Sequence, residues 1–228
     1  MEIDEAEATV FAAVLEAFRK FLKRIKDTVF ADPENPDWLV WPSDEWNRLV
    51  AVLIVPAISQ VFLQTMQEAR VTSERFIADA AATFVGQDLS PIVESQHIPV
   101  RTQSLIFEGI AAGVAAEVLL SAVNPLWLPM LGVMAANGGA TAVNGGLFSA
   151  ARWFSDGGTK SVVKTWIARE DEKTRLTHAL VDNTTVSVND VFNVGGFPLR
   201  YPHDPFGPVN ETVNCRCRLS FRFGVRND

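Results

Sequence analysis

Thr165–Arg218 reads TWIAREDEKTRLTHALVDNTTVSVNDVFNVGGFPLRYPHDPFGPVNETVNCRCR, and most of the unusual polar residues of this chain fall within it. Short β-type runs over 184–188, 191–194 and 213–223 follow one charged helical segment that carries His178. The residues before this stretch have mostly helical patterns. The sequence therefore predicts an α+β fold, with a helical region over residues 1–155 and a small α+β domain with short antiparallel strands over 156–228.

Three helices are expected in the first part of the helical region. Apolar residues recur at three- and four-residue spacing between Glu5 and Phe30, which predicts an amphipathic helix. A second helix is expected from a cap at Ser43 to about residue 70, with a kink or interruption at Pro56. A third is expected from a cap at Ser73 to residue 85.

The second half of the first predicted helix is basic. It carries Lys20, Lys23, Arg24 and Lys26. These side chains form either a solvated face near the helix C-terminus, where cations are favourable, or a contact with DNA, an acidic partner or a membrane surface.

Val118–Ala151 contains no charged residue, which raises the question of a membrane span. Asn124, Pro125 and Pro129 divide this run, so the sequence predicts two buried helices, over 99–123 and 126–153. Small residues in the second helix would allow close helix packing. Membrane insertion of this region, in whole or after a conformational change, stays open as the alternative.

Composition and charge restrict the function classes. The 228 residues carry a net charge of -7 with a pI near 5.0, which argues against broad nucleic-acid binding by the whole surface. Acidic residues, among them Glu2 and Asp4, stand where a signal peptide would be positive. A reducing cytoplasm is therefore the expected compartment, where Cys215 and Cys217 would form a metal site or a buried pair rather than a disulfide.

The two cysteines and one histidine suggest a metal site. Cys215 and Cys217 share one face of the predicted strand, since strand side chains repeat every second residue. His178 would supply a nitrogen. Asp182, one helical turn after His178, and His203 and Asp204 on the following loop are the candidates for the remaining position, since tetrahedral zinc requires four ligands. The alternative is a pair of thiols packed in a small apolar core, with His178 hydrogen-bonded inside it.

A thiol enzyme is a third interpretation of the same residues. Cys215 or Cys217 would be the nucleophile, His178 the base, and Asp182, one helical turn after His178, the residue that orients it. An inward strand position does not favour this reading, because a reactive thiol must be partly exposed.

Four motifs in this order resemble the phage head morphogenesis family, the Mu F-like minor capsid proteins. That family typically has a K-x-W segment, a D-x-R-x-R-x-x-H helix, a Y-P-x-D-P loop and a terminal N-C-R-C. Here the corresponding stretches are Lys164-Thr165-Trp166, Glu172-Lys173-Thr174-Arg175-x-x-His178, Tyr201-Pro202-His203-Asp204-Pro205 and Glu211-Thr212-x-Asn214-Cys215-Arg216-Cys217.

The resemblance covers about residues 159–219, and the chain departs from the family pattern at three places. Ala135-Ala136-Asn137 replaces an Arg-Thr-Glu triplet, and Asp182-Asn183 replaces Asp-Gly. His203 stands where the family usually has Gly, so it is not expected to be a ligand shared by the family. The resemblance leaves His178, Cys215 and Cys217 as the expected ligands, with Asp204 or Asp182 as the fourth.

The resemblance implies a virion component, assembled in the bacterial cytoplasm, and not an enzyme. Such proteins associate with the portal protein or the major capsid protein inside the head, assist head assembly, and in some cases accompany DNA into the cell. Phage DNA and further copies of the chain are additional expected partners, and a membrane is one only if the protein is ejected. Some relatives carry a toxin domain after the N-C-R-C strand. Eleven residues follow Cys217 here, so no such cargo is expected.

Overall fold

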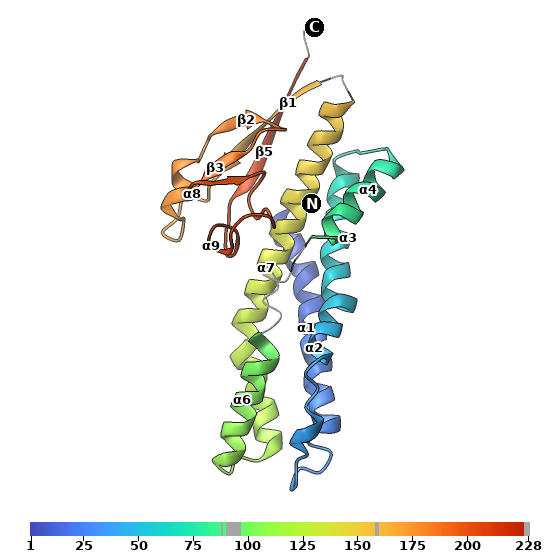
Figure 1. Ribbon diagram of the computed structural model, residues 1–228, viewed down its shortest axis with the longest axis vertical. Helices are drawn as coiled ribbons and strands as arrows, with labels where there is room; N and C mark the ends of the chain where they lie inside the picture. The colour runs from blue at the N-terminus through green and yellow to red at the C-terminus, as the bar shows by residue number, and fades with distance from the viewer. Residues whose placement is uncertain (88, 90–96, 158–159, 226–228) are drawn as a thin grey trace.

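The computed structural model describes residues 1–87, 89, 97–157 and 160–225. It confirms the α+β class: long helices occupy the first two thirds of the chain and a small antiparallel sheet follows. The molecule is elongated, and the sheet lies beside one end of the longest helix, α7 (Figure 1). This arrangement places the cysteine-bearing segment between the sheet and α7.

Helix α1 (Ile3–Thr28) matches the predicted amphipathic helix. Its buried residues, such as Val10, Val14, Phe18 and Phe21, follow the three- and four-residue spacing of one helix face. Acidic residues in the first turn and a lysine in the last turn complement the helix dipole.

The second predicted helix is interrupted before Pro56, as expected. A short 3-10 turn, η1 (Trp38–Val40), precedes α2 (Glu45–Leu49), the π-helix η2 (Val50–Ile54) and α3 (Val55–Glu68). Proline has no backbone N–H, so it is tolerated in the first turn of α3, and the π-helix precedes it. Helix α4 (Glu74–Val85) begins as predicted, with the Ser73 hydroxyl accepting a hydrogen bond from the Phe76 N–H at 3.3 Å.

The prediction for residues 99–153 was wrong in its boundaries. Helix α6 (His97–Ala111) is followed by Gly113, whose φ of 76° allows the Val114 N–H to reach the Gly109 carbonyl and so caps the helix. Helix α7 (Ala116–Asp156) then continues through Pro125 and Pro129. Each proline lacks the N–H that would bond to the carbonyl four residues earlier, namely that of Ser121 or of Pro125. Both of these residues are exposed, so water can reach this side of the helix.

The C-terminal half of α7 is the centre of the helical core, where it packs against α1 and α3. A Cβ atom at Gly139 would lie 2.8 Å from the backbone nitrogen of Glu7, so this close approach requires glycine. By length and composition, Trp38–Glu68 and Ala116–Asp156 could each cross a membrane, a test that buried core helices also pass.

The small domain contains a three-stranded antiparallel sheet of order β2-β1-β5. Its strands are β1 (Lys160–Ile167), β2 (Thr185–Ser187) and β5 (Arg218–Val225). A separate hairpin joins β3 (Phe192–Val194) to β4 (Phe197–Leu199) through two glycines with positive φ. Two short helices, α8 (Leu176–Leu180) and α9 (Val209–Thr212), complete it. Strands β1 and β4 were not among the predicted strands.

The predicted strand over 213–223 begins later than expected. Asn214 has a φ of 56°, which interrupts the extended backbone, and β5 starts only at Arg218. Cys215 and Cys217 therefore lie in the segment before the strand, yet both are buried while Asn214 and Arg218 are exposed. The strand was predicted with the wrong start, and the predicted alternation holds from Cys215 to Leu219 but not at Phe223, which is 47% exposed.

Two hydrophobic clusters correspond to the two regions. The larger one lies among the helices, and the smaller one joins the sheet to Phe148 and Ala151 of α7. Helix α7 ends at Asp156 and β1 begins at Lys160, so the predicted boundary at residues 155–156 lies at the end of a helix that serves both clusters. The division into two domains stays a prediction.

Candidate metal centre

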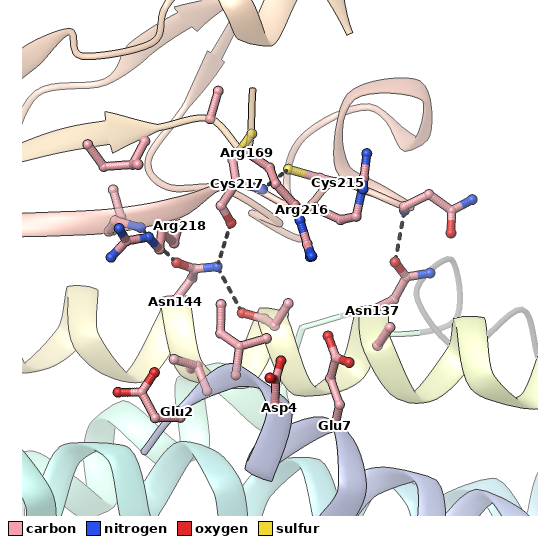
Figure 2. A pocket seen from close by; sticks show the side chains of 18 of the residues that line it. Glu2, Asp4, Glu7, Asn137, Asn144, Arg169, Cys215, Arg216, Cys217 and Arg218 are labelled. Atoms are coloured by element: carbon pink, nitrogen blue, oxygen red, sulfur yellow. Dashed lines mark hydrogen bonds between the residues drawn. The ribbon is translucent and has the colours of Figure 1, made fainter. Parts of the chain in front are cut away.

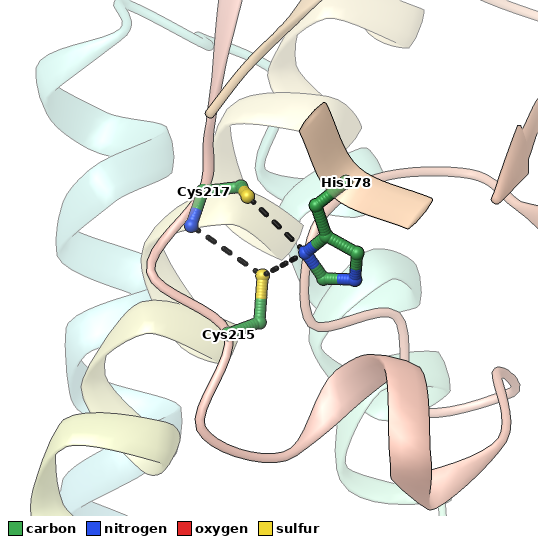
Figure 3. A group of neighbouring side chains, drawn as sticks. All are labelled: His178, Cys215 and Cys217. Carbon is green, nitrogen blue, oxygen red and sulfur yellow. Dashed lines mark hydrogen bonds between the residues drawn. The ribbon is translucent and has the colours of Figure 1, made fainter. Parts of the chain in front are cut away.

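His178, Cys215 and Cys217 come together in the small domain. The His178 Nδ1 atom lies 3.3 Å from the Cys217 sulfur and 3.6 Å from the Cys215 sulfur (Figure 3). All three side chains are buried, and their ligand atoms lie within 4.8 Å of one another. The structure thus brings together three of the predicted ligands from α8 and from the segment before β5.

These distances fit a tetrahedral metal. Zinc bonds of about 2.0–2.1 Å to nitrogen and about 2.3 Å to sulfur give a nitrogen–sulfur edge of about 3.5 Å in a tetrahedron. The two observed distances lie on either side of that value. Thiolate and imidazole are also the ligand types that zinc prefers. The cluster is therefore able to hold a metal ion.

Glu211 fixes the orientation of the histidine. Its Oε2 atom lies 3.1 Å from His178 Nε2 and accepts a hydrogen bond from the Thr177 hydroxyl at 2.8 Å. A carboxylate on the far nitrogen of a ligating histidine is the usual outer-shell partner of a metal site, because it fixes the tautomer that leaves Nδ1 free to bind. Glu211 is itself buried.

Glu211 belongs to one of the four motifs, but its contact with the histidine was not predicted. Its position just before the cysteines was the only indication of a role in the site. A carboxylate that close to buried residues is itself expected to be buried, and a buried carboxylate needs a hydrogen-bonding partner. Glu211 and His178 are 33 residues apart, and only the fold shows that they meet.

The two thiols perturb each other even without a metal. A hydrogen bond from Cys215, helped by His178, lowers the pKa of Cys217 to about 5, although burial opposes the shift. The hydrogen bond to Cys217, together with burial, raises the pKa of Cys215 well above its usual value. One sulfur therefore ionises readily, and thiolate is the form that binds metal.

The predicted fourth ligands lie elsewhere. Asp204 accepts hydrogen bonds from the Arg200 backbone N–H at 2.9 Å and from the Arg200 guanidinium, and it fixes the Tyr201–Pro205 loop. Asp182 accepts from the Ala168 N–H at 2.6 Å, because α8 ends at Leu180 and Asp182 falls beyond its last turn. Neither belongs to the group that could hold a metal.

Two motif residues lie on β1, and one of them, Trp166, contacts the cluster. Lys164 donates to the Arg200 carbonyl at 2.7 Å and lies over the rings of Phe148 and Phe192. Burial lowers its pKa to about 8. Two residues further along the strand, the Trp166 ring meets the His178 ring edge-on at a centroid distance of 5.4 Å.

Asn137 and Asn144 attach the cysteine segment to α7. They are seven residues apart, on one face of the helix. Asn144 donates to the Cys217 carbonyl at 3.5 Å and accepts from the Leu219 N–H at 3.1 Å. Asn137 accepts from the Asn214 N–H at 2.8 Å. The two amides thus hydrogen-bond to backbone groups of the cysteine segment and of Leu219, in the way that a neighbouring strand would at the edge of a sheet.

A cleft of about 920 Å³ separates the start of α1 from the cysteine segment. Figure 2 shows Glu2, Asp4 and Glu7 on the α1 side and arginines on the opposite side, with the two asparagines of α7 between them. The basic residues are Arg169, Lys173, Arg175, Arg216 and Arg218. Among the residues that the structure describes, no ion pair crosses this cleft.

Comparisons with known proteins give one partial match. The NAD(+)--arginine ADP-ribosyltransferase EFV of Enterococcus faecalis (strain ATCC 700802 / V583) is 39% identical over 57 residues. These are 25% of this chain but only 12% of that protein. No family model and no solved structure matches the chain.

Proposed function

We propose that this protein is a minor head protein of a bacteriophage, a structural component of the virion associated with the portal or the inner head. The proposal rests on the four motifs, which resemble the phage head morphogenesis family. It follows that the small domain assists head assembly and that the helical region makes contacts with the portal protein or the major capsid protein.

The observation that carries this proposal is that the motif residues bind one another. Lys164 binds the loop that Asp204 fixes, and His178 binds both cysteines. Arg175 donates from its guanidinium to the Val213 carbonyl, just before the cysteines. Motif residues whose polar groups hydrogen-bond to one another stabilise the fold and are not left free to act on a substrate. Such a structural role is what we expect of motifs in an assembly protein.

We further propose that the cluster binds zinc and that the ion stabilises the small domain. His178, Cys215 and Cys217 are the ligands, and Glu211 holds the histidine. A domain with strands of three to eight residues buries little apolar surface, and a structural metal supplies what the core lacks. The zinc content of protein purified without chelators tests this; a content near zero would remove the metal from the proposal.

The exposed apolar side chains of α6 and the first half of α7 are our proposed contact surface for the portal, the capsid or further copies of the chain. Val100, Val118 and Leu126 are each more than half exposed there. The basic second half of α1 is the part that would contact phage DNA, because its lysines and arginines are mostly exposed.

The match to the Enterococcus transferase fits this proposal. Some members of the phage family carry a toxin domain after the N-C-R-C strand. We propose that the 57 aligned residues belong to a virion-type module and not to the part of that protein that transfers ADP-ribose. Incubation of the full chain with NAD⁺ and free arginine should then yield no ADP-ribosylarginine, and a product would overturn this assignment.

Mass spectrometry of density-purified particles from the producing host tests the proposed function directly. We expect the protein to band with capsid and portal at a low ratio to the major capsid protein. A protein that stays in the soluble fraction and never enters particles would contradict the virion assignment.

One observation favours an enzyme as the second candidate. Cys217, His178 and Glu211 form a thiol–imidazole–carboxylate series with contacts of 3.3 Å and 3.1 Å. Glu211, and not the predicted Asp182, is the carboxylate that contacts the imidazole. Cys217 is only 3% exposed, which opposes this role. Rapid alkylation of native, metal-free protein by iodoacetamide would favour the enzyme, and slow alkylation would favour the structural role.

The uncharged part of α7 supports a further alternative, an ejected protein that enters a membrane. The first half of Val118–Ala151 is largely exposed, whereas the second half is largely buried among helices. Insertion would thus require α7 to leave the helical core. Flotation with liposomes at neutral and acidic pH tests this alternative, and protein that stays at the bottom in both conditions would exclude insertion under them.

A further inference from the structure

The metal cluster has three protein ligands, and no other described His, Cys, Asp or Glu joins the group whose ligand atoms lie within 4.8 Å of one another. His203 is also buried, but it is not part of that group. The buried carboxylates nearby are already engaged. Glu211 binds His178 Nε2, Asp204 binds Arg200, and Asp182 binds the Ala168 N–H. A tetrahedral ion at the cluster would therefore have one position to fill from outside this set.

A small space lies directly beside the cluster. Its volume is about 10 Å³, which is about what one water molecule needs. It is lined by the three ligand residues and by Arg169, Lys173, Thr174, Arg175, Asn214 and Arg216. Most of these residues also line the 920 Å³ cleft, so the space adjoins the larger opening.

The charges around this space favour an anion. A zinc ion with two thiolates and one neutral imidazole is formally neutral, so it attracts an anion only weakly by itself. Four cationic side chains line the space. Asp171 pairs with Arg216 and Arg169, whereas Lys173 and Arg175 have no acidic partner among the described residues. The residues that line the space thus keep an excess of positive charge, and the carboxylates Glu2, Asp4 and Glu7 line the cleft but not this space.

Asn137 adds a second, independent sign of a ligand in the cleft. Its side chain is 2% exposed and lines the cleft, and its Nδ2 donor has no hydrogen-bond partner. A buried amide donor without a partner is costly, and a bound water or an anionic group would satisfy it.

We propose that the fourth position of the metal holds an exchangeable water or hydroxide, which a small anion entering from the cleft displaces. The ion would still join α8 to the cysteine segment and stabilise the fold, but its site would be open, with three protein ligands and one exchangeable position, as in metal centres that bind external ligands. This inference rests on the proposed zinc centre, since without the ion there is no position to fill.

Cobalt substitution tests it on the full chain. Protein freed of metal by a chelator is reconstituted with Co²⁺, whose visible bands report coordination number and ligand type, and sodium azide is then titrated. We expect the intense bands of a tetrahedral thiolate site and a saturable change in those bands with azide. Bands that azide leaves unchanged would overturn the inference while leaving the metal centre intact. If no Co²⁺ or Zn²⁺ binds, both proposals fall.

Two matched variants test the role of the surrounding charge. Lys173→Gln removes one cation beside the space and should weaken azide binding roughly two- to fivefold, in line with the modest strength of exposed charge interactions. Lys26→Gln removes the same charge near the end of α1 and should leave azide affinity unchanged. Equal affinities in both variants would contradict the charge argument.

Discussion

The helical region and the small domain bury different kinds of side chains. The helical core is apolar, with aromatic and aliphatic residues from α1, α3 and α7 interdigitated. The small domain buries many ionisable groups in far fewer residues, namely Lys164, His178, His203, Asp204 and Glu211. Packing of long helices buries enough apolar surface to stabilise their core without many further interactions. The short strands of the small domain bury less apolar surface, so that domain depends more on other interactions. Polar pairing, and in our proposal a metal, makes up the difference.

The largest expected effect is that of metal removal, which should separate the two regions. Binding free energies of structural zinc are about 10–16 kcal/mol in small domains, so a chelator should unfold the small domain and leave the helices folded. Near-ultraviolet circular dichroism should lose the Trp166 contribution while the helical far-ultraviolet signal stays. Loss of both signals together would show that the small domain and the helices unfold as one cooperative unit, which would contradict the expected separation of the two regions.

A truncation in the helical core should have the next largest effect. Phe62 is 1% exposed and stacks on Phe84 at a centroid distance of 4.3 Å. Phe62→Ala should lower the free energy of unfolding by about 3–5 kcal/mol, because it leaves a cavity. Leu39→Ala is the control, since Leu39 is 97% exposed. Urea unfolding followed by far-ultraviolet circular dichroism measures both, and equal midpoints would contradict the packing.

Glu211→Gln tests the outer shell of the metal centre. The amide can no longer hold the imidazole as a carboxylate does, so zinc affinity should fall roughly 10–100-fold. Competition with a chromophoric chelator measures it. Glu172→Gln, an exposed change in the same domain, should leave the affinity unchanged. Unaltered affinity in Glu211→Gln would mean that the carboxylate does not support the site.

Asn144→Ala tests the attachment of the small domain to α7. It leaves the Leu219 N–H and the Cys217 carbonyl without their partners, which should cost about 1–3 kcal/mol. Asn124→Ala changes an exposed asparagine of the same helix and should cost much less. The free energy of unfolding from urea titration compares the two, and equal losses would refute the attachment.

Lys164 should produce the smallest effect, as a dependence of stability on pH. Its folded pKa of about 8 lies below its ordinary value of 10.5, so the unfolded chain binds more protons between these values. Its contribution to stability should therefore rise as pH increases from about 8 to 10.5, and Lys164→Met should remove that rise. Urea midpoints at several pH values measure it. Parallel profiles for both proteins would contradict the prediction.

The sequence by itself determined the features that depend on local pattern. The apolar spacing of α1, the Ser73 cap and the interruption before Pro56 are all signals within a few residues, and each was predicted. The grouping of His178, Cys215 and Cys217 was also predicted, because few other residues of this chain can bind a soft metal.

The tertiary structure decided what depends on distant partners. Pro125 and Pro129 remain inside α7, where the residues whose carbonyls they deprive of donors are exposed, and the chain turns at Gly113 after α6 instead. Strand β1 forms because β2 and β5 pair with it from about 20 and 60 residues away. Asp204 binds Arg200, and Glu211, not a predicted aspartate, meets His178. Buried polar groups take the partners that the fold brings near, and sequence spacing does not contain that information.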